Sequence, residues 1–173
     1  MGNVNHVLML LIATFLSSIS AESKSSEIIV RVYADHNNDT HIVLGTKEAV
    51  IRPKPDQAGI DQVKIADDHR TAGWLILFPD PNNSPIYRSS DIPQSLVIWR
   101  NGKIVRTFEP EQTFWSWSFV DGGDRVAYHS GPLHGERSSH CELREVSTGR
   151  LLASWDGDLD QADRPGWTKS LDH

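Results

Sequence analysis

The segment FWSWSFVDGGDRVAYHSGPLHGERSSHCELREVSTGRLLASW, residues 114–155, decides the fold predicted for this chain. Short apolar runs alternate in it with turn-forming residues, which is the pattern of short β-strands joined by turns. The turns contain Asp121-Gly122-Gly123-Asp124 and Thr148-Gly149, because Gly and Asp tolerate the backbone angles of tight turns. A longer loop is expected from His129 to Ser139. The four expected strands are Phe114 to Phe119, Arg125 to Tyr128, Cys141 to Val146 and Arg150 to Trp155.

The preceding segment, residues 60–108, repeats this arrangement. Gly73 lines up with Ala127 and Gly102 with Gly149, and a longer loop with four prolines in the first copy absorbs the seven-residue difference between the two offsets. Asn101-Gly102 predicts a tight hairpin turn of type I′, which needs positive φ at both central positions. The strands expected here are Gln62 to Ala66, Ala72 to Phe78, Leu96 to Trp99 and Lys103 to Phe108, and the prolines are Pro79, Pro81, Pro85 and Pro93.

Repeats of about 40 to 50 residues with four strands each are typical of propeller blades. Over about 95 residues the order of elements resembles blades of WD-repeat and TolB-type β-propellers. Trp155-Asp156 matches the WD dipeptide, whereas the first copy ends in Phe108-Glu109. The resemblance implies propeller-like sheets. It is carried by Asp121-Gly122-Gly123, Val126-Ala127-Tyr128, Leu143 to Val146, Thr148-Gly149-Arg150 and Trp155.

The sequence as a whole predicts an all-β protein. We expect two four-stranded antiparallel blade-like meander sheets and an N-terminal β-hairpin, in an incomplete propeller or a sandwich-like arrangement. The hairpin strands are Ile28 to Ala34 and His41 to Leu44, a third strand fits Glu48 to Ile51, and Trp167 to Leu171 fits one helical turn. The predicted segments are a signal peptide (1–21), the hairpin with its linker (22–57), two repeats (58–110 and 111–157) and a tail (158–173).

Two blades do not close a ring, since a propeller typically has four to eight. Three arrangements therefore stay open at this point. The sheets can pack face to face as a compact monomer, several chains can assemble into a ring, or an exposed face can dock on a larger partner. We favour the compact monomer, and an oligomer remains an alternative.

The N-terminal residues predict export. Val7 to Leu16 is an apolar run interrupted only by Thr14, and small residues follow it as far as Ala21, which is the pattern of a cleaved signal peptide. The segment before the run lacks Lys and Arg and contains only His6 as a basic residue, so an uncleaved anchor or a buried element remains an alternative. The run is shorter than the about 20 apolar residues of a membrane span. We expect a secreted or periplasmic protein with no membrane span after cleavage.

The composition is that of a folded domain, with 38% hydrophobic and 23% charged residues among 173. The formal net charge of −6 provides no basic field for nucleic acid, so we expect no nucleic-acid partner. Cys141 is the single cysteine, and the fold must hold without an internal disulfide. We favour a buried and inert thiol over one that pairs between chains.

A cluster of metal-ligand residue types lies within thirteen residues: His129, His134, His140 and Cys141. Imidazole and thiolate are the usual ligands of zinc, and Glu136 offers a carboxylate nearby. The spacing matches no common zinc module. The alternative is a solvated blade loop with ordinary histidines.

A second candidate site is aromatic. Trp115, Trp117 and Phe119 alternate with serines, so we expect all three on one side of one strand. Trp115 and Trp117 could then line a binding face for a sugar or a peptide. Packing in the core is the default interpretation of such residues.

No catalytic residue is predicted, because the chain has neither a Gly-x-Ser-x-Gly elbow nor a His-Glu-x-x-His helix nor a phosphate loop. Ser130 follows His129 in sequence, which by itself carries no triad geometry. We expect a non-enzymatic exported module that binds a protein or another envelope component. The alternative is a small metal-binding protein or a metal-dependent hydrolase centred on residues 129–141.

Overall fold

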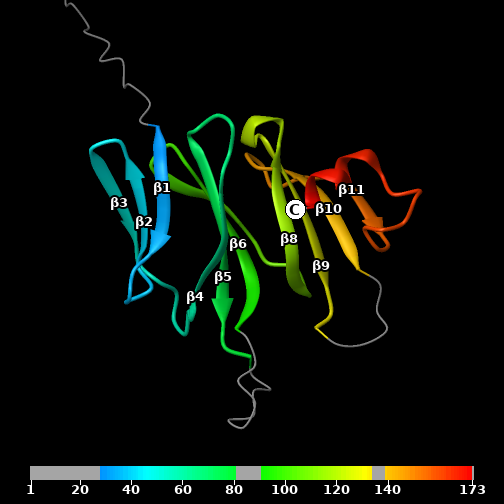
Figure 1. Cartoon of the computed structure of the whole chain (residues 1–173), viewed down its shortest axis with the longest axis horizontal. Helices are drawn as coiled ribbons and strands as arrows, with labels where there is room; N and C mark the ends of the chain where they lie inside the picture. Colours follow the sequence, from blue (N-terminus) through cyan, green and yellow to red (C-terminus); the bar gives the residue numbers. More distant parts are fainter. Residues whose placement is uncertain (1–27, 81–90, 134–138, 173) are drawn as a thin grey trace, which may run out of the picture.

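The computed structural model describes residues 28–80, 91–133 and 139–172, which form three antiparallel β-sheets (Figure 1). We call them the N-terminal, central and C-terminal sheets. Each is a meander, in which every strand pairs with the next one along the chain. The predicted all-β fold with two four-stranded sheets is confirmed.

The strands agree with the expected positions to within a few residues. The N-terminal sheet contains β1 (Ile29–Ala34), β2 (Thr40–Leu44) and β3 (Lys47–Ile51). The central sheet contains β4 (Gly59–Ile65), β5 (Thr71–Phe78), β6 (Ile92–Arg100) and β7 (Lys103–Phe108). The C-terminal sheet contains β8 (Thr113–Val120), β9 (Arg125–Gly131), β10 (His140–Glu145) and β11 (Leu151–Asp156). Two short 3₁₀ helices are η1 (Asp121–Gly123) and η2 (Gly166–Leu171).

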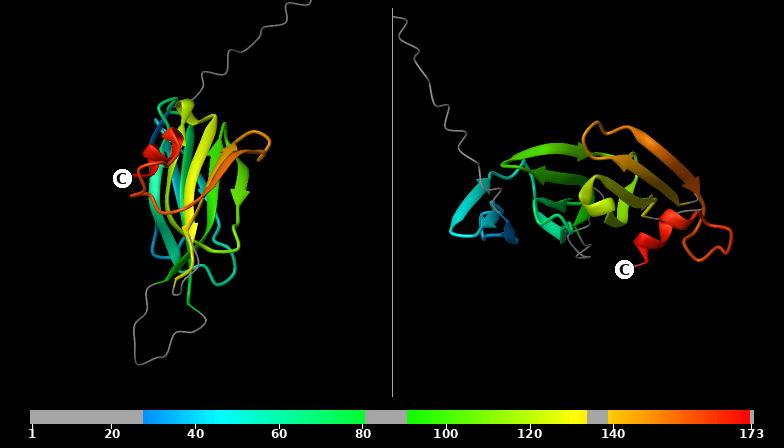
Figure 2. Two further views of the ribbon diagram at one scale, coloured as in Figure 1. Left: turned by 90° about the vertical axis from the view of Figure 1, so that its right-hand side faces the viewer. Right: turned by 90° about the horizontal axis from the view of Figure 1, so that it is seen from above.

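The three sheets pack one after another in chain order (Figure 2). Side chains alternate between the two faces of a strand, so the central sheet is apolar on both. Its Trp74 and Trp99 pack against the N-terminal sheet. Its Leu75 and Ile98 pack against the C-terminal sheet. The central sheet is therefore the middle layer of the fold and contributes to two separate core clusters.

The pairing recurs between the two four-stranded sheets, as the alignment of the repeats requires. Gly73 of β5 faces the next sheet along the chain, and Ala127 of β9 likewise faces the layer that follows it. The neighbouring residues Trp74 and Tyr128 both face the preceding sheet. At the predicted hairpin turn, Asn101 and Gly102 have φ of 51° and 84°, and this confirms positive φ at both positions.

The C-terminal tail forms the layer after the C-terminal sheet. Leu171 of η2 is buried against Ala127 and Cys141. The hydroxyl of Ser116 donates a hydrogen bond to the carbonyl of Leu171 at 3.3 Å. The predicted helical turn at Trp167 to Leu171 is thus present, and it covers part of an otherwise open sheet face.

Two expected loop boundaries were wrong because the strands extend further than the apolar runs. Pro93, expected in a loop, lies in β6 opposite Leu77. The register shifts next to this pair, and such an irregular position suits a residue without an N–H. His129, also expected in a loop, lies in β9, because this strand continues through Gly131 to pair with β8 and β10.

The predicted signal peptide, residues 1–21, lies outside the described residues. Among the residues that the structure describes, no helix is long and apolar enough to cross a membrane. The described helical segments are the two 3₁₀ turns given above.

Candidate ligand-binding groove

A groove of about 980 Å³ lies between β7 of the central sheet and β10 and β11 of the C-terminal sheet. Phe108 and Tyr128, both buried members of the core between these sheets, line it. The connection between the sheets, residues 109–112, forms one end of the groove. The core thus supports the groove directly, and its walls come from both four-stranded sheets.

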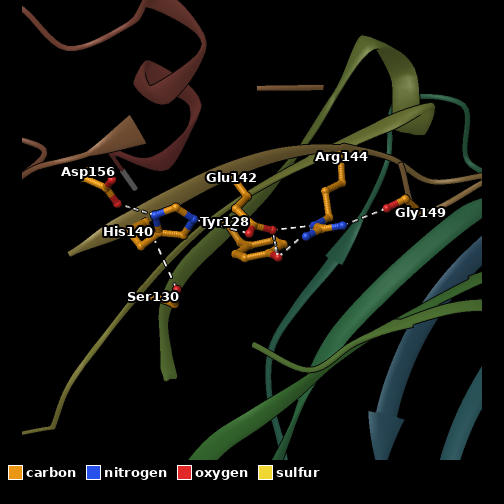
Figure 3. A network of polar contacts seen from close by, with 7 residues as sticks. All are labelled: Tyr128, Ser130, His140, Glu142, Arg144, Gly149 and Asp156. Atoms are coloured by element: carbon orange, nitrogen blue, oxygen red, sulfur yellow. Dashed lines mark hydrogen bonds and ion pairs between the residues drawn. The ribbon is translucent and has the colours of Figure 1, made fainter. Parts of the chain in front are cut away.

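A polar network occupies the face of the C-terminal sheet that lines this groove (Figure 3). His140, Glu142 and Arg144 of β10 are spaced by two residues and therefore project from the same face. Tyr128 of β9 lies directly opposite Glu142 in the register. The alternating residues Cys141 and Leu143 project from the other face, into the core beneath the tail.

Glu142 lies at the centre of this network. The Tyr128 hydroxyl and the Arg144 Nε both donate hydrogen bonds to its Oε2, and His140 Nε2 lies 3.3 Å from its Oε1. Burial by itself would raise the pKa of Glu142, but the hydrogen bonds from Arg144 and Tyr128 outweigh it, and the pKa falls below its usual value. The carboxylate is therefore ionised and held on three sides.

The partners of Glu142 are restrained in turn. Burial, followed by the hydrogen bond to Glu142, raises the pKa of Tyr128, so its hydroxyl remains protonated and acts as a donor. Arg144 also donates from Nε to the Tyr128 oxygen at 3.0 Å and from Nη1 to the carbonyl of Gly149 at 2.9 Å. The hydrogen bond to Glu142 raises the pKa of Arg144 further.

His140 bridges two carboxylates. Its Nδ1 contacts Asp156 of β11, and its Nε2 contacts Glu142. Burial lowers the pKa of His140, but hydrogen bonds to Asp156 and Glu142 outweigh this effect and the net pKa is raised. Both ring nitrogens can donate at once only in the protonated imidazole, which is the form that the two carboxylates favour.

Two arginines from different sheets hold the turn at the opposite end of the groove. Arg106 of β7 donates from Nη2 to the carbonyl of Ser147 at 2.6 Å, while Arg144 donates to Gly149. The Arg106 side chain packs on Gly149, where an added Cβ would lie 3.3 Å from Arg106 Cδ. Gly149 also has a φ of +77°, which favours glycine. This turn is thereby tied to the central sheet.

The predicted metal ligands are divided between two faces of the C-terminal sheet. His129 and Cys141 lie opposite each other in the register and face the tail, whereas His140 faces the groove. Glu136 and His134 lie outside the described residues. Within the described ranges, no three His, Cys, Asp or Glu side chains are arranged to hold a metal ion. A zinc site that includes His134 stays a prediction.

Of the two residues on the tail-facing side, Cys141 is a poor metal ligand in this environment. Cys141 is 0% exposed, and burial raises the pKa of its thiol to about 11. Burial also lowers the pKa of His129, despite the opposing charge of Asp158. The thiol is therefore protonated near neutral pH, and a protonated thiol does not bind zinc well.

The prediction that Trp115, Trp117 and Phe119 share one side of a strand was wrong. Phe114 pairs with Ser130 and Ser116 with His129, so Trp115 is an extra residue at a β-bulge. Trp117 is 0% exposed in the core facing the central sheet, whereas Trp115 is 52% exposed. Trp115 lies instead beside His129, with their ring centroids 6.2 Å apart. The pair cannot form one aromatic binding face.

The polar network was not among the sites expected from sequence. A signal was present, because residues 140–144, His-Cys-Glu-Leu-Arg, alternate polar and apolar side chains with a period of two. This alternation predicts one polar face, on which His140, Glu142 and Arg144 lie together. Ser130, the neighbour of His129 in sequence, donates its hydroxyl to the carbonyl of His140 at 3.3 Å and not to an imidazole ring.

Fold and site together define a class: an all-β protein of stacked sheets with a polar groove between two of them. No known protein family model matches this sequence, and no curated protein matches it either. The function proposed below therefore rests on the groove and its contacts.

Proposed function

We propose that this chain is a non-enzymatic binding module that holds a protein or another envelope component in the groove between β7 and β10–β11. The observation that carries the proposal is the set of contacts that fix Glu142 on three sides. Because the polar network around Glu142 is already held in one conformation, it loses little conformational entropy when a ligand binds in the groove. This preorganisation favours affinity.

The same contacts disfavour proton-transfer chemistry in the groove. The pKa of Tyr128 is raised and that of Glu142 is lowered, so both are far from the near-neutral values that suit a general acid or base. His140 has both ring nitrogens engaged by carboxylates. These groups are better suited to shaping and charging a surface than to exchanging protons with a substrate.

The two four-stranded sheets are proposed to be neighbouring blades of an incomplete propeller of the WD-repeat or TolB type. Their identical meander order supports this, and so does the contact between their first strands. Trp117 Nε1 of β8 donates to the Gln62 carbonyl of β4 at 3.1 Å, and Gln62 Nε2 donates to the Trp115 carbonyl at 3.0 Å. First strands that lie side by side are the arrangement expected of adjacent blades around an axis.

Export is part of the proposal and rests on the run from Val7 to Leu16 with its following small residues. We expect the mature protein in the secreted or periplasmic fraction, starting near Glu22. Mass spectrometry of the protein from fractionated host cells tests this. A cytosolic protein that retains Met1 would contradict it.

Site-specific photo-crosslinking in the producing cell tests the binding function. A benzoylphenylalanine in place of Thr107, which is exposed on β7 and lines the groove, is expected to capture a defined partner. The matched control places the same group at Val50, which is exposed on β3, away from the groove. Adding Glu142→Gln to the Thr107 variant should weaken the capture. Equal products from positions 107 and 50, or none from position 107, would contradict the proposal.

A further inference from the structure

The two ends of the groove differ in charge. The acidic end contains Glu111, Gln112 and Asp156, and the arginine end contains Arg106 and Arg144. Strand pairing creates the acidic end. His140 of β10 lies opposite both Ser130 of β9 and Asp156 of β11, close to where the chain enters β8 from the intersheet connection.

The charges at the acidic end are more available to a ligand than those at the arginine end. The side chain of Asp156 contacts His140 yet is 75% exposed, and Glu111 is exposed with no cation paired to it within the described part of the chain. The two arginines, in contrast, already donate to carbonyls of the turn at residues 146–149. Accessible charge in the groove is therefore mainly negative.

The acidic end also contains a buried acceptor without a donor. Gln112 Oε1 is buried with no hydrogen-bond partner among the described residues, and such an acceptor carries a free-energy penalty until a donor reaches it. The carboxylates of Glu111 and Asp156 add further acceptors. A ligand that supplies N–H donors with a positive charge meets both requirements, as an ammonium or a guanidinium group does.

The shape of the groove favours an extended polypeptide over a small amine. The distance along β10 from His140 to Arg144 is four residue steps, roughly 13 Å, so a strand-like segment of about four or five residues spans it. Within the described residues, β7 and β11 are the last strands of their sheets and flank the groove. Edge strands offer free backbone groups to an added extended segment.

We infer that the groove takes an extended peptide segment that places a Lys or Arg side chain at the acidic end, beside Glu111 and Asp156. This inference rests on the proposed binding function and specifies its ligand. The segment aligns with β10 and directs its cation away from the arginine end, so the two ends together set its orientation as well as its charge preference.

Three acetylated and amidated pentapeptides test the inference: Ser-Val-Lys-Val-Ser and the same sequence with Gln or Glu at the centre. Binding to the mature protein is measured by ¹H–¹⁵N NMR titration. We expect the Lys peptide to bind about fivefold more tightly than the Gln peptide, because exposed ion pairs contribute modestly. The Glu peptide should bind most weakly, and added salt should reduce the preference for Lys.

Substitutions of the acidic residues test which carboxylates cause the preference for the Lys peptide. Glu111→Gln is expected to reduce the affinity for the Lys peptide about two- to threefold while leaving the Gln peptide unchanged. Asp156→Asn should act in the same direction, although it also removes a partner of His140. The matched control is Asp163→Asn, an exposed carboxylate on the tail, which should leave all three affinities unchanged.

Equal binding of the three peptides, a preference for Glu, or no binding of any at millimolar concentration would overturn the inference. Its failure can be told apart from that of the proposed function. If crosslinking at Thr107 captures a defined partner through a segment without Lys or Arg, the binding function stands and the cationic ligand is wrong. If position 107 captures nothing, the binding function itself falls.

Discussion

Trp117 of the C-terminal sheet lies directly over Gly73 of the central sheet. A Cβ added at residue 73 would lie 2.7 Å from Trp117 Cη2 and 2.9 Å from Ile98 Cδ1. The indole also donates its N–H to the carbonyl of Gln62 on the central sheet at 3.1 Å. The two four-stranded sheets approach each other closely at this point, because Gly73 has no side chain and leaves room for the large indole of Trp117.

Gly73→Ala is expected to destabilise the protein by about 1–3 kcal/mol, since the added methyl overpacks the interface between two rigid sheets. Urea unfolding measures the change. Gly166→Ala is the matched control, because residue 166 has no heavy atom within 4 Å of an added Cβ. Equal unfolding midpoints for the two variants would show that the sheets separate enough to accept the methyl.

Substitutions of the two tryptophans that flank Ser116 should differ sharply in their effect on the free energy of unfolding. Trp117→Ala removes a fully buried indole and should cost about 3–5 kcal/mol. Trp115→Ala removes a half-exposed indole at the bulge, and the change should stay within about 1 kcal/mol. Both are measured by urea unfolding. Comparable losses would mean that β8 is in a different register from the one described.

His140 should make stability depend on pH. Its folded pKa is raised, so its contribution is fully present below the unfolded pKa, about 6.5, and is lost as the pH rises through the folded value. His129, with a lowered pKa, has the opposite sign, and the two are separated by comparing the wild type with His140→Gln. The difference in urea midpoint between these proteins should shrink from slightly acid to alkaline pH. A difference that is constant with pH would contradict the assigned contacts.

The thiol of Cys141 should be unreactive in the folded protein. It is fully buried, and burial raises its pKa to about 11, so neither access nor ionisation favours attack at pH 8. We expect a disulfide reagent such as DTNB to label it at the rate of unfolding, and rapidly once urea is added. Fast labelling without denaturant would show that the tail opens and uncovers this face.

The local parts of the fold could be predicted from sequence because neighbouring residues decide them. The strand Lys103–Phe108 was expected with the bounds it has, since Asn101-Gly102 sets a turn immediately before it. The two four-stranded meanders likewise follow from turns that recur in both repeats. Positive φ at these turns is favoured by the Asn and Gly residues themselves, so a local pattern is enough to predict it.

The candidate site was harder to foresee, because it depends on which face of a strand each residue occupies. A single extra residue at Trp115 moves that indole to the opposite face from Trp117. Similarly, nearness in sequence suggested that His129 and His140 converge, whereas the pleat places them on opposite faces of the same sheet. The groove is lined by Arg106 and Glu142, which come from different sheets. Residues so far apart in the sequence share no local pattern that would predict their proximity.

The amino-acid sequence by itself determined the class of fold, the number of strands in each repeat and the turns between them, because φ preferences and apolar alternation act over a few residues. The tertiary structure alone decided the stacking order of the sheets, the face that each aromatic and histidine occupies, and the groove with its charged network. These depend on strand register and on contacts between segments far apart in the chain, and a one-residue bulge is enough to change the face that a side chain occupies.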